Sequence, residues 1–367
     1  MPDPRVEKLA KTLVEYSVKV KPGDWVVIST NRVAEPLAAE VLRHILRAGG
    51  YPSILMSSDA FAEIIFSEAN DEQLEHISPF ERMPLADADV YINIGAVENT
   101  RNLGLIDPAR VQLRSAARKD LMGTYMQRSA SGELRWTLTQ FPCPAFAQEA
   151  DMSLREFEDF VYHATFADQD DPVKHWNELE ARQERLVQWL KGKNKVELHS
   201  PTIDLSMSVD GRRFINSSGT HNMPSGEIFT GPVEDSADGW VEFTYPAIMT
   251  SREVDGVRLE FKAGRVVKAS AKKNEEFLLK MVDQDAGARF LGELGIGTNY
   301  AIDRFTKSIL YDEKIGGTIH LALGASYPET GGKNESALHW DMICDMRRDS
   351  EIRVDGELFY KDGQFQV

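Results

Sequence analysis

The sequence predicts an α/β N-terminal domain with a parallel sheet, followed by an α+β C-terminal domain rich in antiparallel strands. Over the first hundred residues short apolar strands alternate with amphipathic helices, which indicates crossover connections and parallel pairing. After residue 194 several strands flank Asp-Gly or Ala-Gly turns, which are typical of hairpins. The length of 367 residues suits about two domains. We place the boundary at the Lys-Gly-Lys-Asn-Lys turn, between domains 1–190 and 191–367.

The N-terminal half is expected to build its sheet from strands linked by helices. Apolar residues at helical spacing predict helices over 6–13 and 37–46, and Gly49-Gly50 ends the second. Further helices are predicted in two stretches before Ala86, split by Pro79, and over most of 106–192. The predicted strands are 25–28, 53–56, 90–94 and 135–141. A parallel sheet offers a ligand crevice at its strand ends, but no G-x-G-x-x-G follows these strands, so a scaffold or gating role is favoured over nucleotide binding.

The C-terminal half is expected to be mostly antiparallel. Asp210-Gly211 and Ala263-Gly264 are hairpin signals, and Asp355-Gly356 and Asp362-Gly363 predict tight turns near the end. One helix is predicted over 274–292. The predicted strands are 195–199, 204–209, 257–261, 266–271, 318–323 and 338–344.

Composition excludes several classes of protein. The net charge of −16 argues against a nucleic-acid surface and, more weakly, against anionic lipid. It is compatible with cationic or metal partners, and equally with a charge that only keeps the protein in solution. No apolar run of ~20 residues predicts a membrane span, and the polar N-terminus does not resemble a secretory signal. Two cysteines, Cys143 and Cys344, are expected as reduced thiols in a cytoplasmic protein.

The segment around His339 carries the sharpest functional signal. In a strand, His339 and Asp341 point to one face, while Leu338, Trp340 and Met342 point to the other, into a core. An imidazole and a carboxylate that project together suit a divalent metal, although a structural His–Asp hydrogen bond is the simpler alternative.

Three further residues extend this pattern. His320 lies in an apolar, glycine-bounded strand, Glu227 in a turn-rich loop, and Glu293 between glycines that permit close backbone approach. Each is more often a core histidine or a solvated carboxylate. The G-x-x-G-x-G order of 292–297 is discounted as a phosphate loop because it follows a predicted helix.

Together these residues fit metal chemistry. Carboxylates with imidazoles suit zinc, cobalt, manganese or magnesium, and three carboxylates with two histidines suffice for two ions and a bridging carboxylate. No HExxH occurs, which disfavours a single-zinc protease whose ligands lie on one helix.

These motifs resemble the aminopeptidase T family of metallopeptidases. The resemblance runs along the chain and is densest from about 220 to 345. The matching segments are 222–227, 292–299, 312–324 and 339–342.

The resemblance implies a dimeric, two-metal aminopeptidase of broad specificity, with an N-terminal α/β domain and a C-terminal catalytic domain. It implies two divalent ions (zinc, cobalt or magnesium) and peptide substrates with a free N-terminus. Tyr327 matches a family tyrosine near the metals, and Glu313 is a further candidate ligand. By motif the metal ligands carry over to Glu227, Glu293, His320, His339 and Asp341.

The expected mechanism uses a hydroxide held between the two ions, which attacks the first peptide carbonyl. Tyr327 is expected to donate to the oxyanion, and Glu227 or Glu293 to carry the proton to the leaving amine. We favour Glu293 as the bridging ligand. A homodimer is expected to limit substrate size. The alternatives are another dinuclear metallohydrolase acting on amides or esters, or a non-enzymatic metal-stabilised or nucleotide-binding module.

Overall fold

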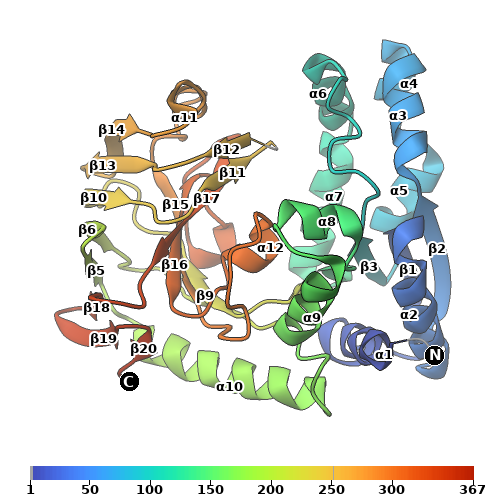
Figure 1. Ribbon diagram of the computed structural model, residues 1–367, viewed down its shortest axis with the longest axis horizontal. Coiled ribbons are helices and arrows are strands. Elements are labelled where there is room, and N and C mark those ends of the chain that lie inside the picture. The colour runs from blue at the N-terminus through green and yellow to red at the C-terminus, as the bar shows by residue number, and fades with distance from the viewer. Residues whose placement is uncertain (1–2, 251) are drawn as a thin grey trace. The chain divides into compact units, whose positions relative to one another are not determined.

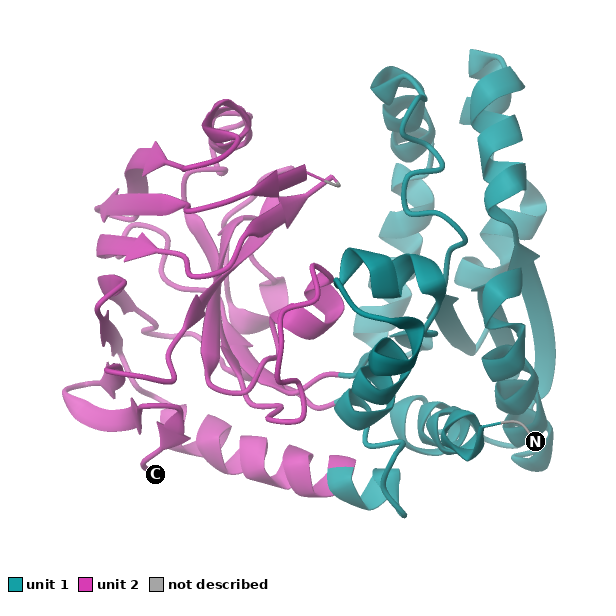
Figure 2. Ribbon diagram, viewed as in Figure 1, with its two compact units in different colours: residues 1–175, 219–224 teal, residues 176–218, 225–367 magenta. Residues whose placement is uncertain are grey.

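A computed structural model describes residues 3–250 and 252–367, and the chain divides into two compact units (Figures 1 and 2). Unit 1 holds the described residues up to His175 together with 219–224, and unit 2 holds 176–218 and the described residues of 225–367. The division falls near the start of helix α10 (Pro172–Leu190), whereas the sequence placed the boundary at the end of that helix. Leu186 and Leu190 belong to the core of unit 2, which explains why most of the helix joins that unit.

Unit 1 is built on a five-stranded sheet in the order β2-β1-β3-β4-β8, and its paired strands are all parallel. Alternate residues of the third strand, Val90, Ile92 and Ile94, are buried. The predicted parallel sheet is therefore confirmed, with one short strand added at the edge from 219–224. The strands are β1 (Trp25–Asn31), β2 (Tyr51–Ser57), β3 (Val90–Gly95), β4 (Arg135–Gln140) and β8 (Asn222–Met223).

Helices connect these strands. Three helices, rather than the predicted two, separate β2 from β3, because the capping box of Asn70 with Gln73 starts an additional short helix. A π-helical turn (Thr12–Ser17) and a 3-10 turn (Arg32–Ala34) complete this part of the chain. The helices are α1 (Pro4–Lys11), α2 (Glu35–Arg47), α3 (Asp59–Glu68), α4 (Asp71–Glu75), α5 (Pro79–Ala86), α6 (Pro108–Ala117), α7 (Lys119–Ser131), α8 (Pro144–Glu149) and α9 (Leu154–Ala164).

Unit 2 contains two antiparallel sheets that share one hydrophobic core. The larger has the order β14-β13-β10-β6-β5-β18-β19-β20 and the smaller β17-β16-β15-β9-β7. Leu198 and Leu259 from the larger sheet meet Leu294, Leu321 and Trp340 from the smaller sheet in that core. The predicted antiparallel character is confirmed.

The strands of the larger sheet are β5 (Lys195–Ser200), β6 (Ile203–Ser208), β10 (Asp238–Glu242), β13 (Arg258–Lys262), β14 (Arg265–Ser270), β18 (Glu351–Val354), β19 (Glu357–Lys361) and β20 (Gln364–Phe365). Those of the smaller sheet are β7 (Ile215–Ser217), β9 (Glu227–Thr230), β15 (Leu291–Gly297), β16 (Thr318–Gly324) and β17 (His339–Asp345). The remaining elements are a ribbon of β11 (Ala247–Met249) and β12 (Arg252–Val254), the helices α11 (Glu275–Val282) and α12 (Ile309–Asp312), and a 3-10 turn (Pro328–Thr330).

Two local predictions are wrong. The helix expected over 274–292 ends at Val282, because the Asp285 carboxylate accepts the backbone N–H groups of Gly287 and Ala288 and forms a turn. The glycine-rich segment 292–297 is consequently a buried strand, not a loop behind a helix. The turn at Asp210-Gly211 leads out of the larger sheet to β7, so it closes no hairpin.

Among the described residues, no helix is both long enough and apolar enough to span a membrane. Cys143 and Cys344 are both buried and free.

Candidate metal centre

Four strands of the smaller sheet of unit 2 carry the candidate ligands on a single face. Glu227 begins β9, Glu293 lies in β15, His320 in β16, and His339 and Asp341 in β17. The register sets Glu227 opposite Gly297, His320 opposite Gly295, and both Glu293 and Asp341 opposite Ala322. Directly opposed residues project from the same side of an antiparallel sheet, so the pairing gathers all five side chains on one side.

Small residues between the ligands make room for them. A Cβ atom on Gly295 would lie 2.0 Å from the Cε1 and Nε2 atoms of His320, so the imidazole rests directly on the glycine backbone. Leu294, Leu321 and Trp340, which alternate with these positions, enter the core as the strand periodicity predicts. The glycines of this strand therefore serve a side-chain site rather than a phosphate.

His320 points one ring nitrogen at carboxylates and the other at the backbone. Its Nε2 lies 3.1 Å from Glu293 Oε1 and 3.5 Å from Glu227 Oε2. Its Nδ1 lies 3.1 Å from the carbonyl oxygen of Glu313. A backbone carbonyl that accepts from Nδ1 leaves the Nε2 lone pair facing the carboxylates, as in metal-binding histidines.

His339 repeats this arrangement. Its Nδ1 lies 2.9 Å from the carbonyl oxygen of Ala325. Its Nε2 lies 3.5 Å from Glu293 Oε2 and 3.5 Å from Asp341 Oδ2. The two oxygens of Glu293 thus face two different histidines.

Burial shapes the electrostatics of the site. Burial raises the pKa of the Glu293 carboxyl, and it raises the pKa of Glu227 to about 7 against the opposing charge of Lys314. Burial lowers the pKa of both histidines, but the facing carboxylates outweigh it, so the pKa of His320 rises to about 10 and that of His339 also rises. This donor set draws protons in the absence of a cation, and metal ions compete with protons for such ligands.

The residues present fit divalent metal ions. Three groups of side chains each have ligand atoms that lie within 4.8 Å of one another. The groups overlap, because Glu293, His320 and Asp341 each belong to two of them. Glu227 Oε2 and Asp341 Oδ1 are buried and have no hydrogen-bond partner in the part of the chain that the structure describes. This is costly for a carboxylate unless a cation or proton meets it. The groups are Glu227 with Glu293 and His320, Glu293 with His339 and Asp341, and Glu313 with His320 and Asp341.

Glu313, the additional candidate, reaches the cluster from the end of helix α12. Its carboxylate also pairs with the adjacent Lys314, whose Nζ lies 3.5 Å from Glu227 Oε1. The Lys314 side chain is fully buried. Sequence reasoning assigned it no role, although a lysine inside the Asp-Glu-Lys segment beside an apolar strand was a usable signal.

Gln183 of α10 is a second residue that sequence reasoning missed. Its buried amide nitrogen donates to the carbonyl oxygens of Glu227 at 2.6 Å and Ser217 at 3.1 Å. These bonds tie the start of β9 to the helix and so place the backbone of Glu227. A polar residue on the inner side of an amphipathic helix was the only sequence signal for it.

Tyr327 follows strand β16 and lies beside the cluster. Its ring contacts the His339 ring edge-on with centroids 5.2 Å apart, and the Phe229 ring with centroids 5.6 Å apart. Burial, together with the nearby carboxylates, raises the pKa of its hydroxyl group. The hydroxyl therefore stays protonated and can donate a hydrogen bond.

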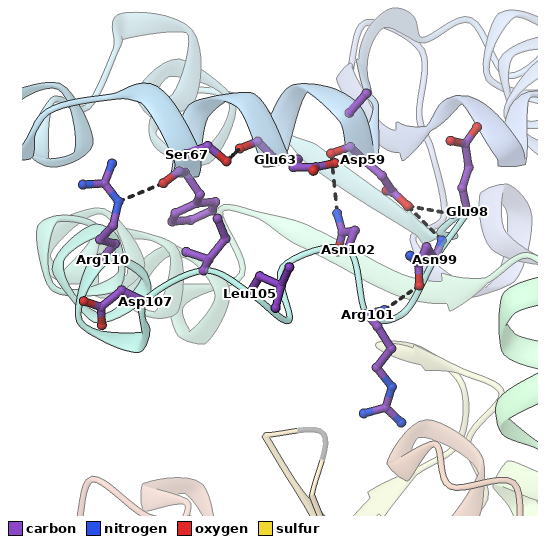
Figure 3. A pocket seen from close by; sticks show the side chains of 13 residues that line it. Asp59, Glu63, Ser67, Glu98, Asn99, Arg101, Asn102, Leu105, Asp107 and Arg110 are labelled. Atoms are coloured by element: carbon purple, nitrogen blue, oxygen red, sulfur yellow. Dashed lines mark hydrogen bonds between the residues drawn. The ribbon is translucent and has the colours of Figure 1, made fainter.

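Unit 1 has a cavity of its own, of about 720 Å³, beyond the carboxyl end of its sheet (Figure 3). Several of its polar groups have partners within the unit. Asp59 accepts from the amide of Asn31 and from the backbone N–H groups of Glu98 and Asn99, and Arg110 donates to backbone carbonyls. These bonds join loops at this end of the sheet, and the scaffold or gating role expected for the domain stays a prediction.

Comparison with known proteins extends these observations. The family model described as thermophilic metalloprotease (M29) matches residues 2–365. The chain is 27% identical to Aminopeptidase 2 of Geobacillus stearothermophilus, covering 98% of this chain and 95% of the relative. It is 25% identical to aminopeptidase AmpS of Bacillus subtilis, covering 96% and 94%, and 29% identical to Aminopeptidase T of Thermus thermophilus, covering 62% of each.

A solved structure, wild-type AmpT from Thermus thermophilus, is similar to the chain as a whole. It superposes with a TM-score of 0.88 over 99% of each chain at 20% sequence identity. At that identity the likeness concerns the fold, and it matches the two-part architecture described above.

Proposed function

We propose that this chain, a metal-dependent aminopeptidase that belongs to the M29 family of thermophilic metalloproteases, holds two divalent ions in the carboxylate and histidine cluster of unit 2. Glu227 and His320 would hold one ion, His339 and Asp341 the other, and Glu293 would bridge them. The observation that carries the proposal is the placement of Glu293, whose Oε1 faces His320 while its Oε2 faces His339. Carboxylates with imidazoles suit zinc, cobalt or magnesium.

Such ions, when bound, polarise the scissile carbonyl and make water a better nucleophile at neutral pH. The chain supplies the remaining groups. The hydroxyl of Tyr327 would donate a hydrogen bond to the oxygen that becomes negative in the transition state. Glu227 would hold an ion through Oε2, which has no hydrogen-bond partner among the described residues, and a carboxylate oxygen that is not held by an ion would carry the proton to the leaving amine. Glu313, which belongs to the group with His320 and Asp341, would be an additional ligand, and the scheme does not depend on it.

We propose that the substrates are peptides with a free N-terminus. A free α-amino group can pair with a carboxylate of the cluster when protonated, or bind an ion through its lone pair when neutral, whereas an acylated nitrogen does neither. This requirement would restrict the enzyme to the first peptide bond.

The test compares a leucine anilide with its N-acetylated form before and after metal removal by a chelator. We expect cleavage of the free-amine substrate alone, loss of activity on chelation, and recovery with at least one of zinc, cobalt or magnesium. Equal cleavage of both substrates would favour a general dinuclear amide or ester hydrolase. Full activity without metal would contradict metal dependence. Metal binding without turnover of any aminoacyl anilide would favour a metal-stabilised module.

We also propose a homodimer that assembles through unit 1. Helix α3 buries none of its side chains, and Phe61, Ile64 and Ile65 on it are all more than half exposed. The neighbouring strand β2 lies at the sheet edge, exposes Ile54 and Met56, and contains no charged residue. An uncharged, self-complementary edge suits a second copy of a chain whose net charge is −16.

The proposed compartment is the cytoplasm. Two buried, free thiols suit a reducing environment.

A further inference from the structure

Lys314 is a buried charged residue of unit 2 to which the proposed reaction gives no role. Lysine is rarely fully buried unless it is paired, and this one is buried among acidic side chains. Its Nζ lies 3.5 Å from Glu227 Oε1 and pairs with a carboxylate oxygen of Glu313. Burial alone lowers the pKa of Lys314, but Glu227 and Glu313 outweigh it and raise the pKa to about 12.

The two carboxylate oxygens of Glu227 face different partners. Oε1 faces Lys314, while Oε2 faces His320 and accepts no hydrogen bond from any described residue. The Glu313 carboxylate pairs with Lys314 through Oε1 and also belongs to the group with His320 and Asp341. Lys314 thus pairs with both of these carboxylates.

We propose that Lys314 is a positioning residue of the metal centre, which engages one oxygen of Glu227 and one of Glu313 so that each turns a single oxygen toward the ions. The inference rests on the proposed two-ion function. Lys314 also places one positive charge beside two of the four clustered carboxylates.

Removing this cation has two opposite consequences. Without Lys314, both carboxylates are free to ligate through both oxygens, and the ions lose a repulsive positive charge. At an effective dielectric constant of about 20, a unit charge a few ångström away changes a binding constant well over tenfold. Metal binding therefore becomes tighter, while ligation through the wrong oxygens displaces the ions, and a displacement of ~1 Å costs about 100-fold in turnover.

The experiment uses Co²⁺ as the probe, because its visible absorption reports the ligand geometry. Co²⁺ affinity by calorimetry, the Co²⁺ spectrum, kcat and KM are measured for the wild type, Lys314→Met and Lys314→Arg. For Lys314→Met we expect at least ~10-fold tighter Co²⁺ binding, an altered spectrum and a kcat lower by ~100-fold. Lys314→Arg keeps the charge and is expected to restore the wild-type spectrum and most of the turnover. Lys272→Met, which removes an exposed ion pair with Glu242, is the matched control and should change none of these quantities.

The outcomes separate this inference from the proposed function. An unchanged Co²⁺ affinity and spectrum in Lys314→Met, with only a lower melting temperature, would assign the lysine to stability and overturn the inference. Failure of both Lys314 variants to fold would overturn it equally. A wild-type protein that binds no Co²⁺ and no other divalent ion would instead contradict the two-ion function itself.

Discussion

At the scale of single residues, the hydroxyl of Tyr327 is the group that separates catalysis from metal binding. Its raised pKa makes it a hydrogen-bond donor, not an ionised ligand. Tyr327→Phe keeps the contacts with His339 and Phe229 and removes only the hydroxyl. We expect kcat to fall by ~100- to 1000-fold, with KM and metal content almost unchanged.

The measurement is steady-state kinetics on a preparation whose metal content is also determined. Tyr300→Phe is the control, because that hydroxyl donates to the carbonyl oxygen of Gly363 elsewhere in unit 2. A normal kcat in Tyr327→Phe at full metal occupancy would remove the tyrosine from the mechanism.

His339 and Asp341 provide the second test at this scale. As ligands of one proposed ion, His339→Ala and Asp341→Ala should each lower turnover by more than the ~10- to 100-fold that loss of an outer partner typically costs. Loss of metal from the purified variant, measured by elemental analysis, should accompany the loss of turnover. His199→Ala, which breaks an exposed pair with Asp204 in the same unit, should leave both quantities unchanged. Wild-type turnover in either site variant would contradict the ligand assignment.

The sequence was informative at this scale where a side chain's direction follows from local periodicity. Alternation along β17 places His339 and Asp341 on one face and Trp340 in the core, as predicted. The contacts of Lys314 with Glu227 depend on how β9 is positioned next to α12, and no local pattern encodes that distance. Gln183 escaped prediction for the same reason, because its partners lie on strands far along the chain.

At the scale of secondary-structure elements, strand β15 needs a residue without a side chain at Gly295, because the His320 ring occupies that space. Gly295→Ala would bring a Cβ atom to 2.0 Å from the His320 ring, which is held at both nitrogens and cannot move freely. We expect a stability loss of about 1–3 kcal/mol, as for other overpacked sites, together with weakened metal binding. Thermal unfolding with and without metal would measure both effects.

Gly123→Ala is the matched control for this substitution. Gly123 lies inside helix α7 with no atom near an added Cβ, so alanine should stabilise the helix by up to ~1 kcal/mol. Wild-type stability and metal affinity in Gly295→Ala would show that His320 can turn away without cost, and would contradict the packing account.

The element scale also shows where sequence patterns misled. The apolar residues after Asn274 continue at a spacing that suits a helix, but the turn formed by Asp285 interrupts it, and β15 is paired on both sides by long-range contacts. Strands such as β16 and β17 were predictable because their apolar faces are continuous. The role of glycine in β15 was not, since it depends on a histidine from the neighbouring strand.

At the scale of the whole molecule, the exposed apolar face of β2 and α3 predicts the oligomeric state. Light scattering should give twice the chain mass of 41.2 kDa for the wild type. Ile64→Asp combined with Ile65→Asp should shift the protein toward monomer, because two charges would be buried at the interface. Leu279→Asp, an exposed apolar position on α11 of unit 2, is the control. A wild-type monomer at micromolar concentration would contradict the proposed dimer.

The division into a parallel and an antiparallel part was predictable at this scale, because the order of strands and helices and the hairpin turns are local signals. The return of 219–224 to the sheet of unit 1 was not, since strand β8 is short and carries no periodic pattern.

The central claim is that one sheet face holds two ions bridged by Glu293. The most direct measurement is anomalous X-ray diffraction from crystals of the protein reconstituted with zinc or cobalt. The account predicts two anomalous peaks, one beside Glu227 and His320 and the other beside His339 and Asp341, with the Glu293 carboxylate between them. A single peak, or peaks away from these side chains, would contradict it.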